Sequence, residues 1–514
     1  SPDGRYVAYL ENDGKQQNLW VRVLATSSNV LAAPATSIQH KLTFSPDGNY
    51  LYYVTRANNS PDSLYKMPAL GGVSQKVVTG IDSFVAVSPD GNRLAFVRNY
   101  PESESSIIVA NADGTEEIKL AVRKSPEAFM SAAWSPDGER LACVGTRRAD
   151  EGFYKDVIEI SAEGGEPEPI TNRRWDAIDE VVWLSDGSGL IIAADQIWQL
   201  TYPGGEERRI TTDLNNYLGL SMTTNSSALV SAQNIAVINL YLQAGADAGS
   251  AKQITSGSAR NDGFSGISWT PDGKIVYTSA ANGHPDIWIM DQDGSNQKQL
   301  TVDLGSKALG LSVSPDGRYI VFVSNRAGSP QVWRVDIDGS NPKQLTFGAQ
   351  GRNPFVSPDG KWIFYFDGAG HASKVPIEGG EPVQLASPFA DILARGFSPD
   401  GKLVAYIPTD RPAQGKKIWI ASSEGRPIKI IDLPPTSRPR MMQWTPDGQA
   451  LTYIEKRGGA DNLWMQPLSG GPPKQLTNFK EYSIHCFAWS PDGKYLVFNR
   501  GFQTSDIVLI NSNK

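Results

Sequence analysis

Short hydrophobic runs recur along the whole chain, and turn-forming residues bound each of them. Leu311–Val313 and Tyr319–Val323, for example, flank the turn Ser314–Gly317. Runs that are this short and this rich in β-branched and aromatic residues predict β-strands. No stretch of the sequence has the 3.6-residue hydrophobic spacing that is typical of a helix. We therefore predict an all-β chain.

The turn Ser-Pro-Asp-Gly marks the repeat. Pro presets the backbone for a type I turn, Asp bonds local N–H groups, and Gly takes the left-handed conformation that follows. Such a turn joins two antiparallel strands. Its third residue recurs at intervals of 39 to 49 residues. The twelve copies, some of them degenerate, are Ser1–Gly4, Ser45–Gly48, Ser88–Gly91, Ser135–Gly138, Leu184–Gly187, Thr223–Ser226, Thr270–Gly273, Ser314–Gly317, Ser357–Gly360, Ser398–Gly401, Thr445–Gly448 and Ser490–Gly493.

Two further strands complete each repeat. The third often carries a Trp, as in Asp286–Met290 and Gln331–Val335. A Gly turn follows, and then a short fourth strand that ends in Thr, as in Lys298–Thr301 and Lys343–Thr346. Four antiparallel strands in roughly 44 residues make one blade of a β-propeller. We predict twelve four-stranded blades.

This repeat resembles the WD-like repeat of TolB-type β-propellers, most closely over Asp272–Thr301 and Asp316–Thr346. The resemblance covers Ser1 to about Asn511. Related arrays cap certain peptidases and are appended to bacterial Ser/Thr kinases and winged-helix regulators. The resemblance implies protein or peptide partners and favours a periplasmic or other extracytoplasmic location, although the residues themselves leave the compartment unknown.

Single propellers usually hold four to eight blades, so we expect two six-bladed rings, residues 1–248 and 249–514. The small residues Ala244–Ser250 read as the linker. The alternative is one twelve-bladed ring.

Strand pairing separates these two arrangements. In the two-ring arrangement, the fourth-strand sequence Lys252–Thr255 closes the last blade by pairing with Asp506–Asn511. The first ring would then take its closing strand from residues before Ser1, where the chain opens within a repeat. In the single ring, Lys252–Thr255 pairs with the local strand Ile235–Leu242.

Composition narrows the partner class. The net charge is −7 and the sequence pI is about 5.4. No phosphate-binding surface is indicated, and we expect no nucleic-acid partner. No apolar run approaches the roughly 18 residues of a membrane span. Cys143 and Cys486 both fall within strands, so we interpret them as small core residues rather than as a disulfide.

Motifs for catalysis and metal binding are missing from the sequence. Asp291 and Asp336 begin segments that imitate calcium loops, but Val302 and Phe347 occupy the twelfth position, where a calcium loop needs Glu. The four histidines have no metal-ligand spacing, and no Gly-x-Ser-x-Gly elbow is present. We predict no catalytic residue, no metal site and no cofactor.

The irregular loops indicate where binding occurs. First-to-second and third-to-fourth turns lie on one face of a propeller and are uniform here, whereas the variable loops lie on the opposite face. Arg and aromatic residues are common anchors of binding surfaces. On the irregular-loop face the candidate binding residues are Arg173, Arg174, Trp175, Tyr217, His284, Arg326, Arg352, Asn353, Arg438, Arg440, Tyr482 and His485.

These features predict a non-catalytic binding or sensing module for a protein or peptide partner, as part of a larger signalling protein that continues before Ser1. One alternative is the substrate-filtering propeller of a serine peptidase whose catalytic domain is absent from this chain. A second alternative is a passive scaffold.

Overall fold

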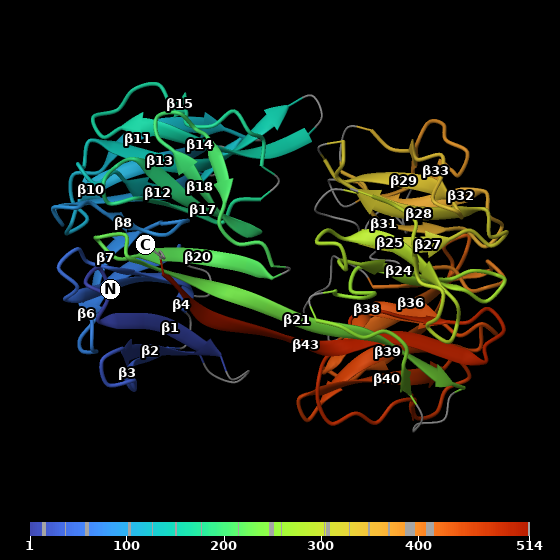
Figure 1. The fold of residues 1–514 in the computed structure, drawn as a ribbon. Helices are drawn as coiled ribbons and strands as arrows, with labels where there is room; N and C mark the ends of the chain where they lie inside the picture. The colour runs from blue at the N-terminus through green and yellow to red at the C-terminus, as the bar shows by residue number, and fades with distance from the viewer. Residues whose placement is uncertain are drawn as a thin grey trace. The chain divides into compact units, whose positions relative to one another are not determined.

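The computed structural model confirms the all-β class: the described part of the chain contains strands and no helix (Figure 1). It describes residues 1–511 except 13–16, 36–37, 57–60, 101–103, 126, 150–151, 176, 214, 246–250, 259, 303, 305–308, 328, 348–349, 368–370, 386–395 and 408–415. Most sheets have four antiparallel strands in chain order, as a β-propeller requires.

The chain forms two compact units. Unit 1 contains residues 1–234 and 505–514, and unit 2 contains residues 235–504. Five sheets lie wholly in unit 1. Their strands, separated here by sheet, are β1 (Tyr6–Asn12), β2 (Gln17–Val23), β3 (Ser28–Ala35); β4 (Ile38–Phe44), β5 (Tyr50–Thr55), β6 (Ser63–Pro68), β7 (Gln75–Thr79); β8 (Ala86–Val87), β9 (Arg93–Tyr100), β10 (Glu104–Asn111), β11 (Ile118–Lys124); β12 (Ala128–Trp134), β13 (Arg140–Ala149), β14 (Gly152–Ser161), β15 (Glu168–Pro169); β16 (Glu180–Trp183), β17 (Gly189–Ala194), β18 (Gln196–Thr201), β19 (Glu207–Arg209).

Five further sheets lie wholly in unit 2. Their strands are β23 (Ile267–Trp269), β24 (Ile275–Ser279), β25 (Asp286–Met290), β26 (Lys298–Gln299); β27 (Leu309–Val313), β28 (Tyr319–Ser324), β29 (Gln331–Asp336), β30 (Lys343–Gln344); β31 (Arg352–Val356), β32 (Trp362–Phe366), β33 (Ala372–Pro376), β34 (Val383–Gln384); β35 (Leu403–Tyr406), β36 (Lys416–Ser422), β37 (Pro427–Leu433); β38 (Ser437–Trp444), β39 (Ala450–Arg457), β40 (Ala460–Pro467), β41 (Lys474–Gln475).

The remaining strands are β20 (Asn216–Met222), β21 (Ala228–Ala244), β22 (Lys252–Gln253), β42 (Phe487–Trp489) and β43 (Tyr495–Asn511). They pair in the order β20, β21, β43, β42, and β22 also pairs with β21. The long strands β21 and β43 lie side by side (Figure 1). β21 starts in unit 1 and ends in unit 2, whereas β43 starts in unit 2 and ends in unit 1.

The hydrophobic core of each unit lies between neighbouring sheets. Val97 and Ile107 of one sheet pack with Cys143 and Ile158 of the next, and all four are buried. The burial of Cys143 raises the pKa of its thiol to about 12, so this residue is the small core hydrophobe that the sequence predicts. Burial of alternating apolar residues on both sheet faces is what holds stacked blades together.

The Ser-Pro-Asp-Gly turns have the predicted backbone and one contact that the sequence did not predict. Gly317 has φ +71°, and its N–H donates to the Ser314 carbonyl (2.9 Å). The Ser314 hydroxyl donates to Asp316 Oδ1 (2.6 Å) and accepts from the Tyr319 N–H (2.9 Å). The Ser314 hydroxyl and the neighbouring Arg318 lower the pKa of Asp316 to about 2. The first residue of the motif therefore fastens the turn to the second strand.

Replacing Gly317 by Val should destabilise unit 2 by about 1–3 kcal/mol, because a β-branched residue is strained at positive φ. The added Cβ would also lie 3.1 Å from Pro271 in the preceding turn. Lys361→Val, at the exposed fifth position of the next turn, is the control and should leave the melting temperature almost unchanged. Equal melting temperatures for Gly317→Val and the unaltered chain would contradict this turn geometry.

In several sheets a threonine at the end of the fourth strand fastens it to the third strand. Thr301 Oγ1 accepts the Ile287 N–H (2.9 Å) and Thr346 Oγ1 accepts the Val332 N–H (2.9 Å). Thr255 Oγ1 accepts the N–H of Leu240, on β21, in the same way (2.9 Å).

The expected pairing of Lys252–Thr255 with Asp506–Asn511 is therefore wrong. β22 pairs with β21 through Tyr241↔Gln253 and Leu242↔Lys252. This is the pairing that a single ring predicts, yet it occurs in a chain with two compact units. The physical reason is that Asn239–Tyr241 has the third-strand pattern, a polar residue followed by an apolar and an aromatic one, and lies nearest in sequence.

The strand Asp506–Asn511 instead enters unit 1. Val508 and Ile510 pack there against a core that includes Ile197 and Tyr217. The predicted domain limits 1–248 and 249–514 stay a prediction, because compact units need not be independently folding domains. Most of the predicted linker, residues 246–250, lies outside the described residues.

Candidate functional site

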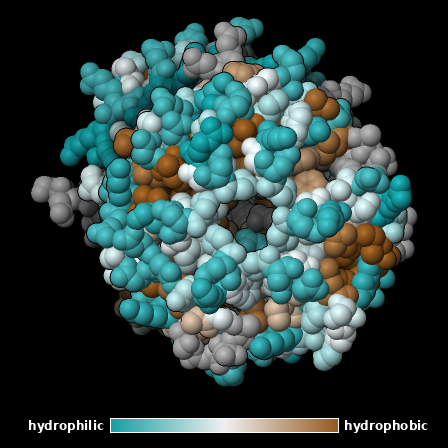
Figure 2. All heavy atoms as spheres, turned by 90° about the vertical axis from the view of Figure 1, so that its right-hand side faces the viewer, coloured by the Kyte–Doolittle hydropathy of each residue, from teal (hydrophilic) through white to brown (hydrophobic). Residues whose placement is uncertain are grey.

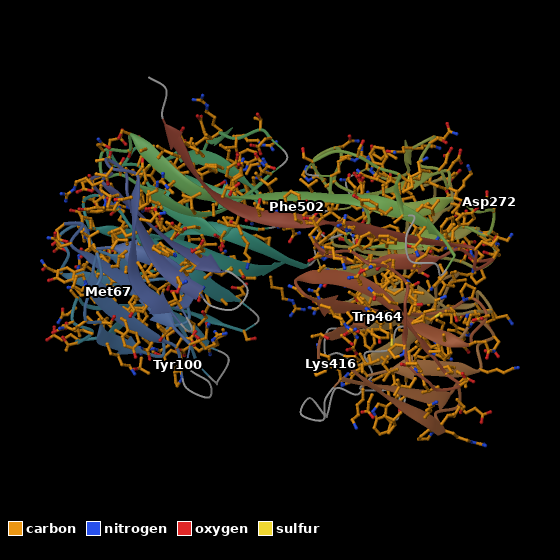
Figure 3. The ribbon with its side chains drawn as sticks, turned by 90° about the horizontal axis from the view of Figure 1, so that it is seen from below. Met67, Tyr100, Asp272, Lys416, Trp464 and Phe502 are labelled. Atoms are coloured by element: carbon orange, nitrogen blue, oxygen red, sulfur yellow. The ribbon has the colours of Figure 1, made fainter. Side chains whose placement is uncertain are left out.

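The two ends of unit 2 differ in their loops. Figure 3 places Asp272, in a regular turn, at one end of this unit, and Lys416 and Phe502 at the opposite end. That opposite end carries the loops between second and third strands, which vary in length. We call it the irregular-loop end, and the other the regular-turn end. Parts of most of these variable loops lie outside the described residues, but Ser279–Asp286 is described throughout.

In unit 1, the predicted residues Arg173 and Trp175 belong to a stack. The Arg173 guanidinium carbon lies 4.1 Å from the Trp175 ring centre and 4.5 Å from that of Trp198. Arg173 Nη1 also pairs with Glu207 Oε2 at 2.8 Å. Trp175 is buried, and its backbone bridges to Lys155. This stack fastens the loop to its own sheet, while Arg173 remains partly exposed.

Two other predicted residues of unit 1 also have local partners. The Arg174 guanidinium lies 5.1 Å from the Tyr154 ring centre. Tyr217 is buried, and its hydroxyl donates to Asp213 Oδ2 (2.6 Å). Desolvation and this hydrogen bond raise the pKa of Tyr217 to about 12. Tyr217 is therefore a packing residue rather than an exposed anchor. Asp176, next to this group, lies outside the described residues.

In unit 2, four predicted residues are exposed at the irregular-loop end, namely His284, Arg326, Arg352 and Asn353. The Arg326 guanidinium lies 5.5 Å from the Trp333 ring centre. Arg352 contacts the side chain of Gln350, its Nε lying 3.1 Å from Oε1. Asn353 has φ +49° and lines a cavity of about 730 Å³ at the centre of unit 2. Arg352 thus projects from a first strand without holding the fold together.

The structure brings Arg438 and His485 together beside a buried carboxylate, Asp461. Arg438 Nη1 pairs with Asp461 Oδ2 at 2.9 Å, and Asp461 is fully buried. The Ile484 N–H donates to the same oxygen (3.1 Å). Within the described chain the second oxygen, Oδ1, has no hydrogen-bond partner. A buried acceptor without a donor is costly.

His485 forms the inner wall of this group. Its ring centre lies 4.7 Å from that of Phe264, and both residues line the central cavity. Desolvation first, and then the positive charge of Arg438, lower the pKa of His485, whereas Asp461 opposes the shift. The imidazole is therefore neutral at pH 7. We call Phe264, Arg438, Asp461 and His485 the His485 cluster.

Tyr482 lies near this cluster and is exposed, with φ +69°. Its ring centre lies 5.2 Å from that of Phe502, and the Arg500 guanidinium lies 4.9 Å from it. Arg440 lies in β38, and its side chain is outside what the structure describes. The aromatic and cationic groups expected at this end are thus present, and several stack on one another.

Sequence reasoning missed Asp461 and Phe264. A signal for Asp461 existed, because it directly precedes the third-strand pattern that begins at Asn462, where Pro285 and Pro330 stand in other repeats. Phe264 carries no such signal, since its contact with His485 joins residues that are distant in sequence.

A central cavity of about 730 Å³ opens within unit 2. The innermost strands β23, β27, β31, β38 and β42 line it, together with turn prolines such as Pro315 and Pro491. Figure 2 shows a hollow at the centre of one face of this unit, surrounded by hydrophilic and neutral residues. Cys486 is half-buried in the wall, so it is less enclosed than the sequence predicts.

The predicted calcium-like segments are hairpin turns. Asp291 pairs with Lys274 Nζ at 2.5 Å, and the Asn296 side-chain amide donates to its second oxygen (2.6 Å). Over the described residues, no group of three or more His, Cys, Asp or Glu side chains could hold a metal ion. Nor does the described chain contain a helix long and apolar enough to cross a membrane.

Comparison with protein families gives two matches. A family described as "TolB beta propeller domain" matches residues 261–436, and one described as "Lipoprotein LpqB beta-propeller domain" matches residues 1–209. The resemblance inferred from the repeats is thereby confirmed.

Curated relatives match over shorter stretches. Tricorn protease homolog 1 of Streptomyces coelicolor is 28% identical over 125 residues, 24% of this chain and 11% of that protein. An uncharacterized protein of Agrobacterium fabrum is 33% identical over 206 residues, 38% of this chain and 66% of that protein. The uncharacterized peptidase YuxL of Bacillus subtilis is 28% identical over 107 residues, 20% of this chain and 16% of that protein. The chain thus spans less than two thirds of these relatives.

The similar solved structures are more distant in sequence. The tricorn protease is 13% identical with a TM-score of 0.34, over 93% of this chain and 52% of that one. TolB from Acinetobacter baumannii is 14% identical with a TM-score of 0.33, over 74% of this chain and 81% of that one.

Proposed function

Because the chain belongs to the TolB-type β-propellers, we propose that it is a non-catalytic binding module for a protein or peptide partner. The partner binds at the irregular-loop end of unit 2, over the His485 cluster and the mouth of the central cavity. The observation that carries this proposal is the partly exposed Arg438 guanidinium, which pairs with the buried Asp461 close to His485 in the cavity wall. A carboxylate or a peptide carbonyl of the partner can accept hydrogen bonds from that guanidinium.

We also infer twelve blades in two six-bladed rings, one ring in each unit. The Trp134 indole donates to the Ala86 carbonyl of the preceding sheet (3.2 Å). The same bond joins Trp269 to the Ala488 carbonyl (3.1 Å), linking the first and last sheets of unit 2. In unit 1 the Thr224 N–H donates to the Pro2 carbonyl (2.9 Å). These contacts support closure of each ring. Each unit then contains part of β21 and part of β43, because both strands run from one unit into the other.

The chemistry of the cluster favours binding over catalysis. Asp461 is already paired with Arg438. A hydrolase would need a nucleophile aligned with a base, and Cys486 is the nearest thiol in sequence; its Sγ contacts the Phe264 carbonyl at 3.5 Å. A thiol held by a backbone carbonyl is not activated as a nucleophile.

The substrate-filtering propeller of a peptidase remains the alternative, because two relatives carry peptidase or protease names. It predicts that short unfolded peptides enter the central cavity of unit 2, whereas the binding module predicts one folded or peptide partner at the loop end. Binding of unrelated short peptides with equal affinity would favour the alternative.

Affinity capture with the intact chain tests the proposal. We expect a partner that the Asp461→Asn and Arg438→Glu variants no longer retain, because the first change removes a charge from the cluster and the second reverses one. The control is Arg318→Glu at the regular-turn end, where Arg318 is exposed and contacts Asp316 and Glu378. Equal capture by all three variants would contradict the proposed site.

A further inference from the structure

A cavity of about 330 Å³ lies at the regular-turn end of unit 2, where Figure 3 places its lining residue Asp272. It opens between two neighbouring sheets, β23–β26 and β27–β30. Ile289, Leu300 and Ile337 form its apolar floor, since all three are partly buried against the core between these sheets. The exposed residues Asp272 and Asp338 line its rim. We call this cavity the turn pocket.

The turn beside the pocket, Thr270–Gly273, is one residue shorter than the other copies. The Thr270 N–H donates to the carbonyl of the fourth residue after it (2.9 Å), whereas the Ser314 N–H donates to that of the fifth (2.9 Å). In the eleven other copies the third residue accepts the N–H two residues further on. Here that N–H, of Lys274, donates instead to Thr270 Oγ1 (2.8 Å), and within the described chain Asp272 accepts no hydrogen bond. The Asp272 carboxylate therefore takes no part in its own turn.

The next gap between sheets, from β27–β30 to β31–β34, shows what fills this place elsewhere in unit 2. Arg334 has there the register position of Ile289. Its guanidinium lies 4.0 Å from the Tyr319 ring centre, and its Nη2 pairs with Glu378 Oε2 at 3.0 Å. The Tyr319 hydroxyl donates to Glu378 Oε1 (3.0 Å). An arginine, an aromatic ring and a carboxylate together close that gap.

The turn pocket has the carboxylate of this arrangement and lacks the other two groups. Asp338 is equivalent to Glu378, since each follows an isoleucine and precedes a glycine in a third-to-fourth turn. Ile289 replaces the arginine, and Lys274 replaces the aromatic ring at the register position of Tyr319. The space is therefore open where a guanidinium lies in the next gap.

The charges of the turn pocket favour a cation. Lys274 Nζ pairs with Asp291 Oδ1 at 2.5 Å, and this bond, with a smaller effect of the Asp272 charge, raises the pKa of Lys274. The Ser340 hydroxyl and N–H donate to Asp338 Oδ1 (2.6 and 2.9 Å) and lower the pKa of Asp338. Both rim carboxylates are thus ionised at neutral pH, and Asp338 Oδ2 accepts no hydrogen bond from the described residues.

Lys298 also lines the pocket, but its ammonium does not exclude a guanidinium. It has the register position of Lys343, which lies beside the arginine of the closed gap and donates its Nζ proton to the Glu378 carbonyl (2.7 Å). The closed gap thus contains a lysine and an arginine with one carboxylate. The turn pocket has two carboxylates, Asp272 and Asp338, and no arginine.

We propose that the turn pocket binds an arginine side chain of a partner protein. The aliphatic stem lies on Ile289, Leu300 and Ile337, and the guanidinium bonds to the carboxylates of Asp272 and Asp338. Arginine fits better than lysine, because its planar guanidinium can bond to two carboxylates at once. This goes beyond the proposed function, because the pocket lies at the regular-turn end and shares no residue with the His485 cluster.

Titration with a capped arginine tests the proposal. The probe is Nα-acetyl-L-arginine methylamide, added to the intact chain with labelled isoleucine methyl groups, and the NMR signals of Ile289 and Ile337 report binding. We expect saturable shifts of both signals. The citrulline counterpart has nearly the same shape without the charge and should bind at least about tenfold more weakly. Absence of saturable shifts, or equal binding of the two probes, would overturn the proposal.

Two variants locate the bound side chain. Asp272→Asn should weaken binding of the arginine probe by about tenfold at an unchanged melting temperature, because the carboxylate takes no part in its turn. Ile289→Arg should abolish binding, because the added guanidinium occupies the pocket as Arg334 does in the next gap. The control Glu424→Gln, 73% exposed in the turn between β36 and β37, should bind like the unaltered chain. Unchanged binding in either pocket variant would overturn the proposal.

Free L-arginine distinguishes a partner's residue from a small ligand. It carries α-amino and carboxylate charges that an arginine within a chain lacks. We expect free arginine to bind no more tightly than the capped probe. Binding at least about tenfold tighter would indicate a site for a free amino acid and overturn the assignment to a partner protein.

Discussion

Asp156→Ala should lower the free energy of unfolding by about 3–5 kcal/mol, since removing one partner of a buried ion pair leaves an uncompensated buried charge. Asp156 and Arg123 are both buried, with Arg123 Nη2 2.9 Å from Asp156 Oδ2. Arg147 Nε lies 2.8 Å from the same oxygen. Without the carboxylate, the Arg123 guanidinium remains buried inside unit 1 and lacks this charged partner. Urea denaturation followed by tryptophan fluorescence measures the effect.

The matched control for this variant is Glu163→Ala. The Glu163 side chain is 90% exposed and its pairing with Arg93 is loose, at 3.8 Å, so the change should cost no more than about 0.5 kcal/mol. The double variant Arg123→Met/Asp156→Leu should recover most of the stability, because apolar replacements remove both buried charges. A loss for Asp156→Ala no larger than that for Glu163→Ala would contradict the buried pair.

Gly501→Val should be the second severe change, costing about 3 kcal/mol as an overpacked core position does. A Cβ at Gly501, in β43, would overlap the Val237 carbonyl oxygen of β21. Both residues belong to unit 2, and Gly501 also exchanges backbone hydrogen bonds with Ser483. The strand cannot move away on either side, so β21 must separate from it.

Hydrogen exchange reports this separation. Ile238 and Leu240 bond on the side of β21 away from β43, so the alternating residues Val237 and Asn239 face β43. In Gly501→Val the amides of Val237 and Asn239 should therefore exchange faster than in the unaltered chain. Thr504→Val, exposed and three residues further along β43, is the control and should preserve both amide protection and melting temperature. Unchanged protection in Gly501→Val would show that β21 and β43 are not packed as described.

The repeat made the sheets predictable, because each turn, third-strand Trp and terminal Thr acts on residues close in sequence. Thr346, for example, bonds the Val332 amide only fourteen residues away. The pairing of Lys252–Thr255 was mispredicted although the same local rule applied: Thr255 bonds the Leu240 amide. The third-strand pattern at Asn239–Tyr241 carries Tyr where most repeats have Trp, and it lies within one long strand.

The candidate site was less predictable, because exposure depends on neighbouring sheets. Trp175 and Tyr217 have the residue types of binding anchors, yet both are buried by packing within unit 1. Arg438 and His485 are separated by 47 residues and meet only because β38 and β42 are adjacent inner strands. The buried Asp461 that joins them belongs to no motif.

The central claim is that the irregular-loop end of unit 2 binds the partner. It is tested most directly by measuring the dissociation constant of the captured partner for two matched arginine variants. Arg352→Glu changes an exposed residue at that end, whose side chain contacts Gln350. Arg318→Glu changes an exposed residue at the regular-turn end. We predict that Arg352→Glu weakens binding by at least about tenfold and that Arg318→Glu leaves the dissociation constant unchanged. Both variants should have the same melting temperature. Weaker binding for Arg318→Glu alone would place the partner on the opposite end and contradict the account.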